Sequence, residues 1–148
     1  MGYKKYFLLC FILCTFCYGA EHESRYLKMA FEAHKKGLYT LSNSQIEKHI
    51  QQNPKSPDLD YAFLLSAANY IQLKEYNKAI IKLNFLKNNY PDSPFLKDAL
   101  SYLALTYLKT KDVNSAVSSY RDYKKKFGDN VFIEKQIEEF LLHLAISL

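Results

Sequence analysis

The sequence predicts an all-α protein, an α-solenoid of stacked helix hairpins, and three observations carry this prediction. Glycine and proline number only four each in 148 residues, too few for the turns of a many-stranded sheet protein. Similar residues recur at a constant offset of 37 positions. Small and bulky residues follow a helical period inside each recurring unit. We expect units over about residues 21–57, 58–94 and 95–131, and then a capping helix over about residues 132–148.

The repeat is clearest in two proline-containing linkers. Residues 90–94 read Tyr-Pro-Asp-Ser-Pro, and residues 53–57 read Asn-Pro-Lys-Ser-Pro. The same offset pairs Ala62 with Ala99, Ala67 with Ala104, Tyr70 with Tyr107, Ala79 with Ala116, and, backwards, Ala67 with Ala30. So many matches at one offset indicate a true internal repeat. The predicted helices cover about residues 24–36, 38–52, 58–73, 76–89, 95–110 and 113–127.

The spacing of small and aromatic residues predicts how each hairpin packs. Alanines twelve positions apart are expected where the two helices approach most closely, and these are Ala67, Ala79, Ala104 and Ala116. An aromatic wedge follows three positions after the first small residue, at Tyr70 and Tyr107. The first unit departs from the pattern, with Ala33 in the aromatic place and Ser42 in the second small place. The order of residues is similar to the tetratricopeptide repeat, whose usual period is 34.

The final helix is expected to cover the open end of the stack, because no second helix follows it in the pattern. Its apolar side is predicted to comprise Ile133, Ile137, Phe140, Leu141 and Leu144.

Residues 1–20 have the features of a secretory signal peptide. Lys4 and Lys5 precede an apolar run over residues 6–18, and the small residues Gly19 and Ala20 follow. The run is too short for a membrane-spanning helix, which takes about 20 residues. Cleavage after Ala20 would leave an exported protein; the alternative is a retained N-terminal anchor. All three cysteines lie in this segment, and Cys17 is a candidate lipid-attachment site that would tether the protein to a membrane.

Composition argues against catalysis, metal binding and nucleic-acid binding. Loss of residues 1–20 would remove two lysines and no acidic residue, which lowers the formal net charge from +5 to +3. A nucleic-acid-binding protein would instead carry a concentrated basic stripe. The four histidines lack the converging partners of a zinc site, and no phosphate-binding loop or nucleophile motif is present. We expect no enzyme activity and no cofactor.

A bacterial resemblance rests on residues 89–100, which read Asn-Tyr-Pro-Asp-Ser-Pro-Phe-Leu-Lys-Asp-Ala-Leu, and on residues 103–107, which read Leu-Ala-Leu-Thr-Tyr. This segment resembles the BamD family, the lipoproteins of the outer-membrane β-barrel assembly machinery. It also resembles the YbgF (CpoB) family, the periplasmic partners of the Tol-Pal system. The resemblance implies an envelope scaffold that binds proteins. A soluble chaperone that holds unfolded clients is a third reading.

The first helices of the hairpins are expected to line a concave groove that holds a partner peptide. Counting from the small positions identifies the residues on that face, and the candidates for partner binding among them are Phe31, Tyr61, Leu64, Ile71, Leu105, Leu108 and Lys109. If the groove binds, its apolar members should be partly exposed in the free protein. The alternative is that some of them pack against the final helix or against a neighbouring first helix.

Overall fold

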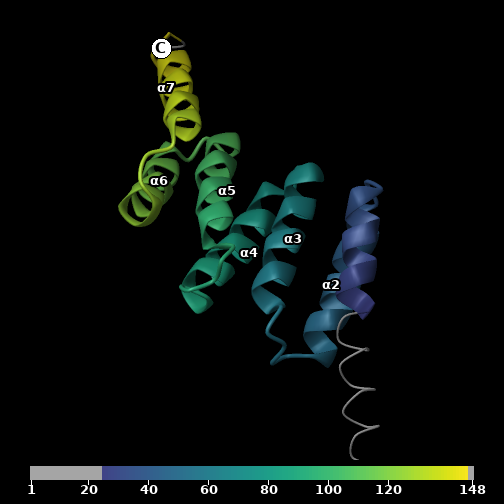
Figure 1. The fold of residues 1–148 in the computed structure, drawn as a ribbon. Helices are drawn as coiled ribbons and strands as arrows, with labels where there is room; N and C mark the ends of the chain where they lie inside the picture. The colour runs from purple at the N-terminus through teal and green to yellow at the C-terminus, as the bar shows by residue number, and fades with distance from the viewer. Residues whose placement is uncertain (1–24, 147–148) are drawn as a thin grey trace, which may run out of the picture. The chain divides into compact units, whose positions relative to one another are not determined.

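The computed structural model describes residues 25–146, and these residues form helices joined by short turns (Figure 1). The predicted signal peptide, its cleavage point and Cys17 lie outside the described residues. The chain divides into two compact units, one ending at Ser56 and the other beginning at Pro57. No helix in the described part of the chain is long and apolar enough to cross a membrane.

The first unit is a single helix hairpin. A helix over residues 25–35 is followed by α2 (Tyr39–Gln52). The Ser42 hydroxyl donates a hydrogen bond of 2.8 Å to the Ala30 carbonyl across the hairpin. Ala30 and Ser42 are the two small positions that the repeat predicted for this unit, and both are fully buried. Ser42 therefore allows the close approach of the two helices by its small size, and its hydroxyl also joins them by a hydrogen bond.

The second unit contains two hairpins and a final helix. The first hairpin pairs α3 (Leu59–Gln72) with α4 (Tyr76–Asn89), and the second pairs α5 (Leu96–Lys109) with α6 (Val113–Phe127). The hairpins stack through α4 and α5, and α7 (Val131–Ile146) follows (Figure 1). The predicted bounds of the hairpin helices agree with the structure to within one residue. The prediction of an all-α solenoid with a final helix is confirmed.

All three hairpins turn in the same way, at positions separated by the repeat offset. Gly37, Lys74 and Lys111 have positive φ values of 73°, 60° and 63°. The N–H of the residue that follows donates a hydrogen bond to the carbonyl oxygen five positions earlier. The three bonds run from Leu38 to Ala33, from Glu75 to Tyr70 and from Asp112 to Tyr107. This bond closes the end of a helix when one residue adopts the left-handed conformation. In two of the three turns the residue in this conformation is lysine, although glycine adopts it at the lowest cost in free energy.

The predicted packing positions form the core of the second unit. Ala67, Ala79, Ala104 and Ala116 are each 0% exposed, which confirms the close approach within each hairpin. The tyrosine wedges are half-buried, and the Tyr107 hydroxyl accepts a hydrogen bond of 3.1 Å from Asn84 on α4. The wedge thus contacts the helix of the preceding hairpin as well as filling space.

The final helix is held at its N-terminal end. The Asn130 side chain accepts a hydrogen bond from the Ile133 N–H and donates one to Tyr123. Lys124 on α6 pairs with Asp129 at 2.6 Å and with Glu134 at 3.4 Å. Ile133 and Ile137 are buried as predicted, whereas Leu141 is 45% exposed. The prediction for Leu141 is wrong, because the anchoring contacts lie in the first half of α7 and the apolar side chain of Leu141 stays open.

Candidate protein-binding groove

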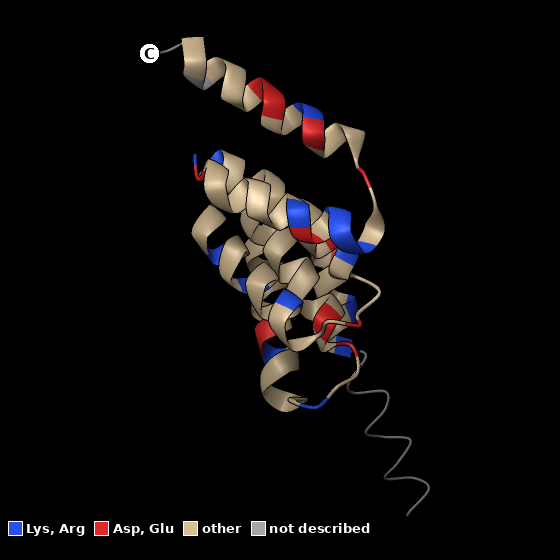
Figure 2. Ribbon diagram, turned by 90° about the vertical axis from the view of Figure 1, so that its left-hand side faces the viewer, with Lys and Arg blue, Asp and Glu red and all other residues tan. Residues whose placement is uncertain are grey.

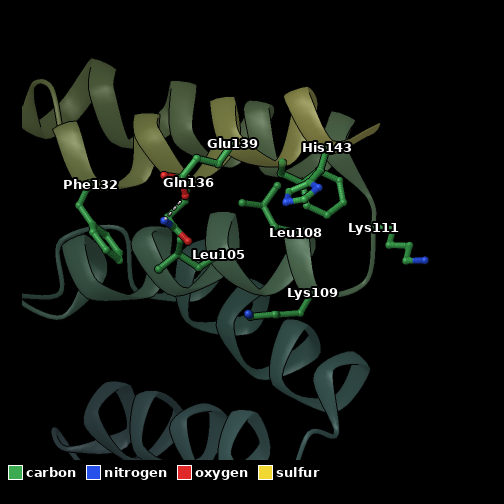
Figure 3. Close-up of a pocket in the computed structure, with 9 residues that line it drawn as sticks. Leu105, Leu108, Lys109, Lys111, Phe132, Gln136, Glu139 and His143 are labelled. Atoms are coloured by element: carbon green, nitrogen blue, oxygen red, sulfur yellow. Dashed lines mark hydrogen bonds between the residues drawn. The ribbon is translucent and has the colours of Figure 1, made fainter. Parts of the chain in front are cut away.

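Two cavities meet on α5 in the second unit. The first, of about 250 Å³, lies between α3 and α5 and is called the α3–α5 cavity; it is lined by Ala68, Ile71, Gln72, Tyr102, Leu105, Thr106 and Lys109. The second, of about 510 Å³, lies between α5 and α7 and is called the α5–α7 cavity. Its lining comprises Leu105, Leu108, Lys109, Lys111, Phe132, Gln136, Glu139, Phe140 and His143 (Figure 3). Leu105 and Lys109 line both, so the two cavities together form one groove.

Helical periodicity explains why these side chains converge. On α3 the lining residues lie at positions i, i+3 and i+4, from Ala68 to Gln72. On α5 they lie at i, i+3, i+4 and i+7, from Tyr102 to Lys109. Such spacing places side chains on one face of a helix. The groove is the inner face of two consecutive first helices, extended by the facing side of α7.

Three of the predicted groove residues line these cavities and retain exposed surface. Ile71 and Leu105 are half-buried, and Lys109 is exposed. Ile71 and Leu105 thus have the partial exposure that was expected of the apolar groove residues. Whether these residues bind a partner stays a prediction.

Leu108 lines the α5–α7 cavity but is only 8% exposed. The expectation that it is open in the free protein is wrong, because α7 packs against α5 over this part of the helix (Figure 3). For Leu108 the alternative of packing against the final helix holds. It contributes to the floor of the cavity and to the core at once.

The other predicted groove residues lie apart from the two cavities. Tyr61 lines a separate cavity of about 490 Å³ beside the linkers, with its ring 5.3 Å from that of Phe95. Burial raises the pKa of the Tyr61 phenol. Leu64 is half-buried on α3, and Phe31 is 41% exposed in the first unit.

Sequence reasoning missed the contribution of α7 to the groove. Phe132, Gln136 and Phe140 are four positions apart and all line the α5–α7 cavity. This spacing is visible in the sequence, but of the three residues only Phe140 was assigned to the apolar side of the predicted cap. The polar member Gln136 donates a hydrogen bond of 3.1 Å to Glu139, as the dashed line in Figure 3 shows.

The positive charge in the groove comes from Lys109 at the end of α5 and from Lys111 in the turn that follows. Lys109 is the one charged residue lining the α3–α5 cavity, and none of the ion pairs recorded for residues 25–146 involves it. Glu139 on α7 is engaged by Lys135 at 3.8 Å. The Lys and Glu residues of α7 lie between Glu134 and Glu139, and the rest of the helix carries no Lys, Arg, Asp or Glu (Figure 2). In the described part of the chain no group of three or more His, Cys, Asp or Glu could hold a metal ion.

Comparison with known proteins identifies the repeats. Residues 61–93 and 98–130 each match the family model described as tetratricopeptide repeat. The structure is similar to the crystal structure of the Sgt2 TPR domain from Aspergillus fumigatus, with a TM-score of 0.67 and 14% sequence identity over 85% of this chain and 81% of that chain. At this identity the likeness concerns the fold alone. Comparison with curated proteins gave no match. Two segments of the chain therefore match the tetratricopeptide repeat, and stacked repeats of this kind form concave surfaces that bind other molecules.

Proposed function

We propose that the groove formed by the α3–α5 and α5–α7 cavities holds a segment of another protein. The observation that carries this proposal is that two apolar cavities share Leu105 and Lys109 on one exposed helix face. The free energy of binding would come from burying apolar side chains of the partner against Ile71, Leu105 and the rings of α7. Polar residues at the margins would fix the orientation of the segment.

The proposal extends to an exported scaffold of the cell envelope, of the BamD kind. Its support is the signal-like pattern of residues 1–20 and the resemblance of residues 89–107 to that family. In this setting the protein would lie in the periplasm, associated with the outer membrane through a lipid on Cys17 or through its partner. Fractionation of cells tests the location, and incorporation of a labelled fatty acid that is lost in Cys17→Ser tests the lipid.

The groove is tested by mild crosslinking in cells, followed by identification of the bound proteins. We compare the unmodified protein with Ile71→Asp and with Ile81→Asp. Ile71 lines the α3–α5 cavity, whereas Ile81 is 66% exposed on α4 and lines neither of the two cavities. Both variants introduce the same charge in place of the same side chain. We expect Ile71→Asp to lose the partner, because an aspartate in the apolar groove must be desolvated on binding. Ile81→Asp should keep it.

The outcome separates the alternatives. Capture of one complex at fixed stoichiometry by the unmodified protein supports a scaffold, and the identity of that complex separates β-barrel assembly from Tol-Pal. Weak capture of many unfolded proteins would favour a client-holding chaperone. Equal capture by Ile71→Asp and the unmodified protein would place the binding surface elsewhere. Leu108→Asp is unsuitable for this test, because Leu108 is buried and its replacement would destabilise the fold.

A further inference from the structure

We propose that the bound segment carries an acidic side chain between two apolar ones, with the acid over Lys109 and the apolar residues in the α3–α5 and α5–α7 cavities. This inference rests on the proposed function and names the chemistry of the partner. It follows from the place of Lys109, the last residue of α5, which lines both cavities and is exposed.

The cation at this point lacks a counter-charge within the described residues. The recorded ion pairs over residues 25–146 leave Lys109 out. Glu139 is the acidic residue lining the α5–α7 cavity, and it pairs with Lys135 and accepts a hydrogen bond from Gln136. Lys111 lines the same cavity and adds positive charge. The groove therefore presents an excess of positive charge next to apolar walls.

Binding changes the environment of this cation. While the groove is open, water solvates the Lys109 ammonium group. A partner that fills both cavities displaces part of that water. The desolvation of the ammonium group weakens binding unless an anion of the partner replaces the water. A carboxylate on the partner would restore the lost interaction with a charge-assisted hydrogen bond. A neutral partner residue would bind less well, and a lysine or arginine would be rejected.

The geometry also sets the spacing of the motif. The two cavities lie side by side on one face of α5, where they share Leu105 and Lys109, and packed helices are separated by roughly 8–10 Å. An extended chain advances about 3.3 Å per residue. The two apolar side chains should therefore be about two or three positions apart, with the acidic residue between them. This is a motif that can be recognised in a set of bound peptides without knowledge of the natural partner.

The probe is a random library of displayed twelve-residue peptides, selected on the full chain. The same selection is made on Lys109→Glu, Lys97→Glu and Ile71→Asp. Lys97 is exposed near the start of α5 and lines neither of the two cavities, so Lys97→Glu is a control of equal charge change on the same helix. Individual enriched peptides are then synthesised, and their affinities are measured at low and high salt.

We expect the unmodified protein and Lys97→Glu to enrich peptides with Asp or Glu between two apolar residues. Replacing that acid by lysine in one peptide should weaken its binding roughly tenfold or more, and salt should reduce the difference. Lys109→Glu should reverse the preference toward lysine or arginine. Peptides that bind the groove without an acidic preference, or a preference that Lys109→Glu leaves unchanged, would overturn the inference and leave the proposed function standing. Failure to enrich any peptide, or equal enrichment on Ile71→Asp, would overturn the proposed function itself.

Discussion

The hairpin of the first unit and the α3–α4 hairpin reach the same local geometry with different side chains. The turn is made by Gly37 in the first hairpin and by Lys74 in the second, with φ values of 73° and 60°. The small position on the second helix is Ser42 in one and Ala79 in the other, and both are fully buried. Only Ser42 adds a hydrogen bond across the hairpin, to the carbonyl of Ala30. The comparison teaches that the repeat fixes side-chain size and backbone conformation, whereas residue type is free within those limits.

The strongest way to break both hairpins is to enlarge the small residue on their first helix. Ala30 and Ala67 are each 0% exposed, as is Ala104 in the third hairpin. Replacing any one of them with leucine should lower the free energy of unfolding by about 1–3 kcal/mol, because overpacking forces the helices apart. Chemical denaturation followed by circular dichroism measures the change. Ala145 is the matched control, because it is an exposed alanine on α7, so Ala145→Leu makes the same change without overpacking and should cost less.

The turn of the first hairpin should be sensitive to any side chain. A Cβ added at Gly37 would meet nothing within 4 Å, so Gly37→Ala tests the backbone conformation alone. We expect a loss of about 1–2 kcal/mol, because an L-residue with a side chain is strained at positive φ. Thermal unfolding of the variant should show a lower midpoint. An unchanged midpoint would mean that the turn tolerates side chains as readily as the Lys74 turn does.

The hydrogen bond that distinguishes the first hairpin should have a smaller effect. Ser42→Ala removes the donor to the Ala30 carbonyl while keeping the residue small. We expect the free energy of unfolding to fall by about 0.5–1.5 kcal/mol. The size-matched counterpart is Ala79→Ser in α4, which adds a hydroxyl at a fully buried position. If Ser42→Ala leaves the free energy of unfolding unchanged, the hydrogen bond adds nothing to stability, and only the small size of the side chain matters at this position.

The smallest effect is expected at the turn of the second hairpin. Lys74→Gly relieves the strain of a side chain at positive φ, although glycine also gives the unfolded chain more freedom. The net result should be a gain in stability of about 0.5 kcal/mol. Lys111→Gly should behave in the same way, because its φ of 63° is nearly the same. A loss of stability in both variants would show that the lysine side chains make contributions that outweigh the strain.

Much of the groove could be predicted, and the part that could not depends on contacts between distant segments. Ile71, Leu105 and Lys109 were placed by counting along helices from Ala67 and Ala104, which needs only the helical period. Leu108 satisfied the same count and is nevertheless buried, because α7 covers it. Phe132 and Gln136 were missed as groove residues for the same reason. Periodicity assigns a residue to a helix face, but it does not say what lies opposite that face.

The sequence by itself determined the helices, their hairpin pairing and the positions that must be small. These features follow from local periodicity and from a repeat of 37 residues, and both are read along the chain. Only the tertiary structure decided how α7 packs, that it encloses a cavity with α5, and that Lys109 lines both cavities. The physical reason is that α7 makes few of the contacts that define a hairpin. Its position depends on the Asn130 cap, on the ion pairs of Lys124 and on two buried isoleucines rather than on the repeated pattern.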